Sequence, residues 1–174
     1  YYWQLHPNRE PKKVLPIYGH TLDTVHFEEL TLPNVTEGRP YFETEQLDLG
    51  PFSVTFMKTI HPVVCYAMRF VENSTGKIFV FTGDSGYLAE FSDFAADADL
   101  FLADTYLFAG NEHHKAHFTS KEAGEFAKKA QVKRLVLTHL PQFGDLNQLR
   151  NEAIQAAGEE IPVDLAEVKG VFEI

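Results

Sequence analysis

The stretch VFTGDSGY, residues 80–87, joins a mainly apolar run to a turn that carries a carboxylate. The run at residues 77–81 is typical of a buried strand, and Thr82, Gly83 and Asp84 follow it. Glycine and aspartate are also ordinary turn residues, since glycine tolerates positive φ and aspartate bonds to its own backbone. The rest of the chain must therefore decide whether Asp84 only makes a turn or belongs to a functional site.

Composition limits the classes of protein to consider. The chain has 174 residues, which favours one domain, and 44% of them are hydrophobic, enough for a core. Lys and Arg total 15 against 25 Asp and Glu, and the net charge of −10 disfavours binding of nucleic acid by phosphate neutralisation alone. The single cysteine, Cys65, cannot form an internal disulfide, so we expect a reducing, cytoplasmic compartment. No apolar run approaches the ~20 residues that span a membrane.

Alternating strand and helix patterns predict an α/β or α+β fold with layered packing, and we take α/β as the fold class. The clearest helix begins after Thr119, which forms a capping box with Glu122 ahead of apolar residues at helical spacing. Residues 64–84 predict a hairpin that turns at 73–76, and residues 31–50 are interpreted as an acidic linker. The other elements are expected as strands at 12–19, 52–60, 99–103, 134–138, 161–166 and 170–174, and as helices at 21–30 and 145–158.

Side chains able to bind a metal follow four of the expected strands: His61, Asp84, Asp104 and His139. Open α/β sheets gather their ligands at the carboxyl ends of strands, so these side chains can meet in space. Histidine nitrogen and carboxylate oxygen, with little cysteine, are ligands that suit a metal ion. Each residue alone has an ordinary interpretation, as a histidine bonded to backbone or as a turn carboxylate. Their joint occurrence predicts a metal site.

Three segments resemble, in order and spacing, the second half of the metallo-β-lactamase superfamily, and most closely its ribonuclease Z-like hydrolases: TIHPVVCYAMRF, FVFTGDSGY and LFLADTY…AHFTSKEAGEFAKKAQVKRLVLTHL. The resemblance implies an αβ/βα four-layer sandwich, of which this chain is the C-terminal half with part of the first half missing. It also implies a site for two zinc ions, with manganese or iron as alternatives. In that site His61 is the third-motif histidine, Asp84 the bridging aspartate and His139 the last ligand.

The resemblance further implies a proton relay between a carboxylate and a histidine. Asp104 stands where this branch has a glutamate, and His117 stands at the relay histidine, with Phe118 in place of serine. The two metals would share an activated hydroxide, and His117 would protonate the departing oxygen. Gly83 and Gly86 would leave room for metal and substrate.

The H-x-H-x-D-H motif of this family does not occur in the chain, so we expect residues 1–174 to be a partial domain that lacks its N-terminal portion. By the usual size of such a domain, that portion amounts to about 60–80 residues. Its absence would bare an apolar face, so the chain alone should aggregate, pair as a homodimer or fold poorly, and it should lack hydrolase activity. The residues expected at this shared core are Phe52, Val54, Phe56, Ile78, Val80, Leu135 and Leu137.

By this resemblance the complete protein is a zinc-dependent hydrolase, and the pair of His117 and Asp104 favours a phosphodiesterase. With a net charge of −10 and no basic arm in the chain, a small phosphodiester is favoured over tRNA as the substrate. A tRNA 3′-processing ribonuclease of the ribonuclease Z type and a lactonase-type hydrolase stay open as alternatives. So do an inactive structural fragment and a mononuclear metal-binding module.

Overall fold

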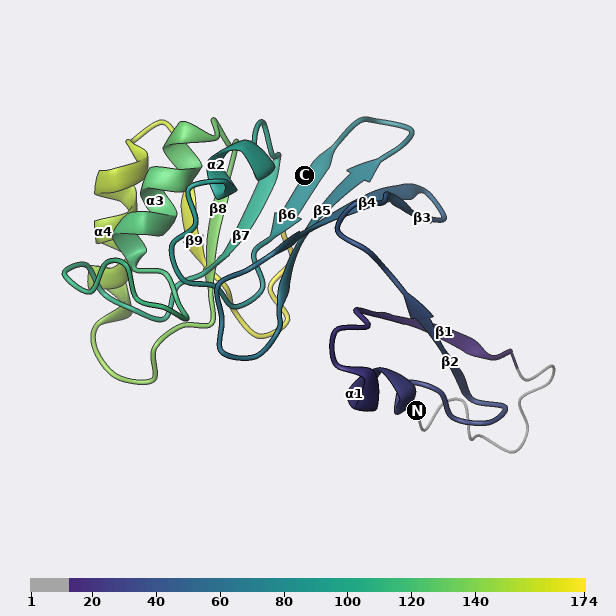
Figure 1. The fold of residues 1–174 in the computed structure, drawn as a ribbon. Helices are drawn as coiled ribbons and strands as arrows, with labels where there is room; N and C mark the ends of the chain where they lie inside the picture. The colour runs from purple at the N-terminus through teal and green to yellow at the C-terminus, as the bar shows by residue number, and fades with distance from the viewer. Residues whose placement is uncertain (1–12) are drawn as a thin grey trace. The chain divides into compact units, whose positions relative to one another are not determined.

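The computed structural model of the chain describes residues 13–174 and separates into two units, divided between Glu45 and Gln46 (Figure 1). The first unit holds three elements: β1 (Leu15–Gly19), α1 (Thr24–Glu28) and β2 (Thr36–Pro40). The second unit holds the rest: β3 (Leu47–Leu49), β4 (Phe52–Lys58), β5 (Tyr66–Glu72), β6 (Ile78–Phe81), α2 (Phe91–Phe94), β7 (Leu100–Asp104), α3 (Ser120–Lys129), β8 (Leu135–Thr138), α4 (Leu146–Ala157) and β9 (Val163–Leu165).

The first unit is a parallel pair of strands, β1 and β2, joined through the short helix α1. The helix begins after Asp23, whose side chain accepts a hydrogen bond from the backbone N–H of His26. Strand β2 lies inside residues 31–50, and so does β3, so the prediction of a linker there was wrong. The β2 sequence TEGRP has no apolar alternation, and its pairing with β1 makes it a strand.

The second unit is built on a mixed sheet of seven strands in the order β3-β4-β5-β6-β7-β8-β9. Strands β3 to β6 pair antiparallel, and they include the predicted hairpin, whose turn ends at Gly76 with φ +74°. Strands β6 to β9 pair parallel, and α2, α3 and α4 form their crossovers on one face of the sheet (Figure 1). The predicted α/β class is therefore confirmed.

The register divides the expected core residues between the two faces of the sheet. Phe56 and Phe81 both pair with Met68 and share one face, so Val80 points to the other face, beneath the helices. Leu135 and Leu137 are fully buried there with Val80. Phe52, at the end of β4, is 40% exposed. The expectation of a single shared face was wrong, because neighbouring residues of a strand alternate between faces.

Helices α3 and α4 pack closely because Gly124 lacks a side chain. A methyl group at Gly124 would collide with the carbonyl oxygen of Ala153 on α4. Helix α3 has the predicted capping box between Thr119 and Glu122, and α4 ends at Gly158 as expected. Helix α2 was not predicted, and residues 170–174 are not a strand in the structure. No helix within residues 13–174 is long and apolar enough to cross a membrane.

A buried carboxylate, Asp99, joins three segments at the start of β7. It accepts hydrogen bonds from the Ile78 N–H and from the ammonium groups of Lys77 and Lys133, at 2.8, 3.2 and 2.8 Å. Burial alone would raise the pKa of Asp99, but the hydrogen bonds from Lys133, Ile78 and Lys77 outweigh it and hold the pKa at about 2. Asp99 therefore stabilises the fold in its ionised form.

We expect Asp99→Asn to lower the free energy of unfolding of the intact protein by about 1–3 kcal/mol at neutral pH, because charge-assisted hydrogen bonds are lost. The folded pKa lies below the unfolded one, so this contribution is present above about pH 4 and disappears as the pH falls toward 2. Urea denaturation of both proteins across this range measures the difference. A constant difference from pH 7 to pH 2 would contradict the assignment.

Candidate metal centre

Five side chains with metal-capable atoms meet at the carboxyl edge of the parallel strands. Asp84 follows β6, Asp104 ends β7 and His139 follows β8. His61 reaches the same edge because β4 runs parallel to β6, with β5 antiparallel between them. His117 comes from the loop that precedes α3. The structure thus brings together all five residues that the sequence singled out, and their chemical roles stay predictions.

Their side chains form an alternating chain of imidazoles and carboxylates. His117 Nδ1 lies 2.9 Å from Asp104 Oδ2, and His139 Nδ1 lies 3.2 Å from Asp104 Oδ1. His139 Nδ1 also lies 3.3 Å from Asp84 Oδ1, and His61 Nε2 lies 3.9 Å from Asp84 Oδ2. Asp104, expected only as the partner of His117, therefore contacts a predicted metal ligand as well.

Two groups of three residues could each hold a metal ion, with candidate ligand atoms within 4.8 Å of one another. One group is His61, Asp84 and His117, and the other is Asp104, His117 and His139. The three predicted ligands are thus divided between the two groups, and His117 belongs to both. The position of His117 beside the ligands fits either a proton donor or a further ligand.

His61 is oriented by the backbone that follows it. Its Nδ1 lies 3.0 Å from the carbonyl oxygen and 3.3 Å from the backbone nitrogen of Val63, and Nε2 faces Asp84. In the tautomer with a proton on Nδ1, the ring donates to the Val63 oxygen and leaves Nε2 free to bind a metal. Such a bond to one ring nitrogen fixes the tautomer that presents the other to a metal. His61 can therefore be both a strand-end histidine bonded to backbone and a metal ligand.

The glycines beside Asp84 serve backbone packing. Gly83 has φ +60°, and a Cβ there would lie 2.8 Å from Cys65 Sγ and 2.9 Å from the Tyr66 oxygen. A Cβ at Gly86 would collide with the carbonyl oxygen of His114. The expectation that these glycines leave room for metal and substrate is therefore corrected: they let neighbouring backbone approach.

Asp104 is the most enclosed member of the cluster, at 1% exposed. Burial raises the pKa of its carboxyl to about 7, and the charge of Asp84 adds to the rise, while the Ser85 N–H and His139 act in the opposite direction. Burial also lowers the pKa of His117; the nearby His61 lowers it further, against the effect of Asp84. Burial thus disfavours charge on both members of the pair.

The donor set fits a divalent metal ion. Within residues 13–174, the ion pairs of Asp84 and Asp104 are all with histidines, at 2.9 to 3.9 Å. A metal ion beside Asp84 would supply the positive charge that favours two adjacent carboxylates in ionised form. Imidazole nitrogen and carboxylate oxygen are the donors that zinc takes in catalytic sites.

Tyr106 is a site residue that the sequence analysis missed. Its ring centroid lies 5.2 Å from that of His117 and 5.3 Å from that of His139. The side chain is 38% exposed, so it borders the site on the solvent side. Its position two residues after Asp104, at the end of a buried strand, was the available signal.

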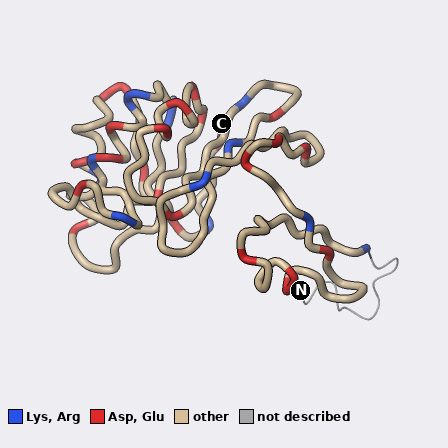
Figure 2. Tube along the Cα trace, viewed as in Figure 1, with Lys and Arg blue, Asp and Glu red and all other residues tan. Residues whose placement is uncertain are grey.

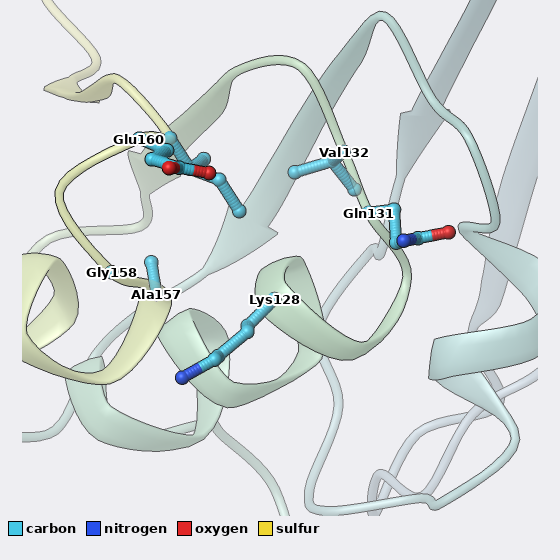
Figure 3. Close-up of a pocket in the computed structure, with 7 residues that line it drawn as sticks. Lys128, Gln131, Val132, Ala157, Gly158 and Glu160 are labelled. Carbon is cyan, nitrogen blue, oxygen red and sulfur yellow. The ribbon is translucent and has the colours of Figure 1, made fainter.

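The hollow between the ends of α3 and α4 lies at the opposite edge of the sheet. It measures about 510 Å³ and is lined by residues that precede β8 and β9, including Lys128, Gln131, Val132, Ala157, Gly158 and Glu160 (Figure 3). These residues stand at the amino ends of parallel strands, whereas the donor cluster stands at the carboxyl ends. The hollow therefore does not belong to the candidate metal centre.

Comparison with known proteins identifies the family. A model of the beta-lactamase superfamily domain matches residues 19–140, so the chain belongs to this superfamily and has the metallo-β-lactamase fold. It is 43% identical over 150 residues to the probable metallo-hydrolase YhfI of Bacillus subtilis, covering 86% of this chain and 61% of YhfI. The crystal structure of YhfI matches with a TM-score of 0.83 and 41% identity, over 88% of this chain and 63% of that one.

A further relative agrees with the ribonuclease Z-like branch. The chain is 37% identical over 82 residues to a ribonuclease Z of Picrophilus torridus, covering 45% of this chain and 26% of that protein. A diphosphatase of the PhnP family shares the fold, with a TM-score of 0.68 at 16% identity, over 97% of this chain and 63% of that one. The chain thus spans less than two thirds of the length of each of these relatives.

His139 occupies a strained backbone position, with φ +53°. A side chain in this left-handed region costs about 1–2 kcal/mol, which glycine avoids. We therefore expect His139→Gly to be more stable than His139→Ala by about 1 kcal/mol, although both lack the imidazole. Urea denaturation of the metal-free intact protein compares the two variants. Equal stability, or a more stable alanine variant, would count against strain at the site.

Proposed function

We propose that the intact protein is a metal-dependent hydrolase that cleaves small phosphodiesters and uses zinc. The observation that carries this proposal is the 2.9 Å bond between His117 Nδ1 and Asp104 Oδ2 among the metal-capable donors. A site that only binds metal does not need an oriented histidine beside its ligands. A hydrolase needs such a group to protonate its leaving oxygen.

Each residue of the cluster has a role in this proposal. His61, Asp84 and His139 hold the metal, which when bound polarises the substrate and activates water. Asp104 accepts the hydrogen bond from His117 Nδ1 and so fixes the orientation of the ring. His117 Nε2 is then the atom that gives a proton to the departing oxygen. Burial lowers the pKa of His117, which favours release of that proton.

The distribution of charge supports a small substrate. The net charge is −10, and Figure 2 shows acidic and basic residues interspersed along the described trace of both units. A large polyanion such as tRNA is usually held by a basic patch. A small phosphodiester needs only the metal and a few nearby donors. The unpaired Cys65 favours the cytoplasm as the compartment.

A tRNA 3′-processing ribonuclease is the second candidate. It is favoured by the similarity to the ribonuclease Z of Picrophilus torridus over 82 residues. Residues outside this chain could supply the basic surface that such a substrate requires. Cleavage of a precursor tRNA by the intact protein at a rate far above that of small phosphodiesters would select this function.

Metal analysis with a substrate panel tests the proposal. The intact protein is purified, its metal content measured, and its activity compared on bis-p-nitrophenyl phosphate, a cyclic nucleotide, a lactone and a precursor tRNA. Two metal ions per chain and phosphodiester cleavage that stops with a chelator are the expected results. One ion without activity would favour a mononuclear binding module. Lactone hydrolysis without phosphodiester cleavage would also overturn the proposal.

We expect His117→Ala in the intact protein to cut phosphodiester turnover by ~10²–10⁴-fold, because the leaving oxygen loses its proton donor. Metal content should stay unchanged, since His61, Asp84 and His139 remain. The matched control is His113→Asn, which replaces an exposed histidine of the same loop, and asparagine tolerates its φ of +64°. This control should keep full turnover. Loss of metal in His117→Ala would instead make His117 a ligand.

A further inference from the structure

The loop at residues 108–117 delivers His117 to the site and is closed at its base. Leu107 N–H donates to the Phe118 oxygen at 3.2 Å, and Ser120 N–H donates to the Leu107 oxygen at 2.8 Å. The base therefore holds the two ends of the loop together. Its interior has no regular strand or helix, so other contacts must set its path.

Glu122 supplies the first of these contacts. Its carboxylate is 1% exposed and belongs to neither group of metal-capable residues. Oε1 accepts from the backbone N–H of His113 at 2.8 Å, while Oε2 accepts from the N–H and hydroxyl of Thr119 at 2.9 and 3.0 Å. One buried group thus ties the middle of the loop to the start of α3, two residues after His117.

Glu152 on α4 supplies a second contact. Its Oε2 accepts from the backbone N–H of Ala109 at 2.9 Å and from the hydroxyl of Ser120, and its Oε1 accepts from the Gln148 amide at 2.8 Å. The first half of the loop is therefore held by α4 and the second half by α3. On its other side, the loop backbone rests against Gly86 at His114.

We propose that Glu122 is a positioning residue that sets His117 against Asp104. Both of its oxygens face N–H groups, from His113 and from Thr119, so neither position accepts an amide NH₂. Displacement of the loop moves His117 away from Asp104, and a shift of ~1 Å in a reacting group can cost about 10²-fold in rate. The catalytic consequence rests on the proposed function, whereas the effect on the position of His117 does not.

Glu122→Gln in the intact protein tests this role. Whichever way the new amide turns, its NH₂ faces the N–H of His113 or of Thr119. The hydrogen bond from that N–H group is then lost. We expect turnover to fall about 10–100-fold, with KM and metal content nearly unchanged. The ¹⁵N signals of the His117 imidazole should shift as its bond to Asp104 weakens. If this variant cannot be purified, Glu122→Asp, which keeps two oxygens but shortens their reach, should shift the His117 signals from their wild-type positions, and unchanged signals would overturn the role.

Two control variants separate positioning from general destabilisation. Glu152→Gln can keep its bonds to Ala109 and Ser120 because Gln148 can turn its amide, so it should leave the His117 signals and turnover unchanged. Thr119→Ala weakens the start of α3 but keeps the bond from His113 to Glu122. It should unfold at a lower urea concentration than the wild type without moving the His117 signals.

The outcomes distinguish the positioning role of Glu122 from the proposed phosphodiesterase function. Unchanged His117 signals in Glu122→Gln would overturn the positioning role, and so would an equal shift in Thr119→Ala. The His117 signals could shift only in Glu122→Gln while the wild-type protein cleaves no phosphodiester. That result would support the positioning role and reject the proposed function.

Discussion

The candidate site depends on the buried carboxylate of Asp104. An isolated charge removed from water costs several kcal/mol, so such a group must be surrounded by donors. Here the donors come from three other segments: the Ser85 amide in the turn after β6, His117 in the loop before α3, and His139 after β8. Segments far apart in the sequence are thereby brought to one point. The same contacts orient the imidazoles of His117 and His139. The buried Asp104 carboxylate therefore also organises the site.

Much of this arrangement could be predicted from the sequence, because strand ends follow a simple geometric rule. An apolar run marks a buried strand, and parallel strands bring the residues that follow them to one edge of the sheet. His139 follows such a run directly, and Asp84 comes three residues after one. His61 reaches the edge because β5 runs antiparallel between β4 and β6, an arrangement that the structure shows and the sequence analysis did not derive. The capping box at Thr119 likewise fixed the start of α3.

The features that escaped prediction depend on pairing and on contacts between distant backbones. Strand β2 is polar and becomes a strand through β1, so no local pattern reveals it. The face of the sheet on which Val80 lies follows from register, which the hydrophobic run alone leaves undetermined. Gly83 and Gly86 look like space for a ligand until the backbone that packs against them is known. Tyr106 was overlooked because a tyrosine after a strand is unremarkable without its two histidine neighbours.

The close approach of helices α3 and α4 at Gly124 has a consequence for natural variation in this fold. The two helices carry Glu122 and Glu152, whose carboxylates hold the loop that ends at His117. Any side chain at Gly124 would collide with the Ala153 oxygen and push the helices apart. This shift would displace the carboxylates of Glu122 and Glu152 together. A sequence with every metal-capable residue intact can therefore still lose its chemistry through a single methyl group on the far side of a helix. An inventory of ligands cannot by itself tell an active member of this family from a silent one.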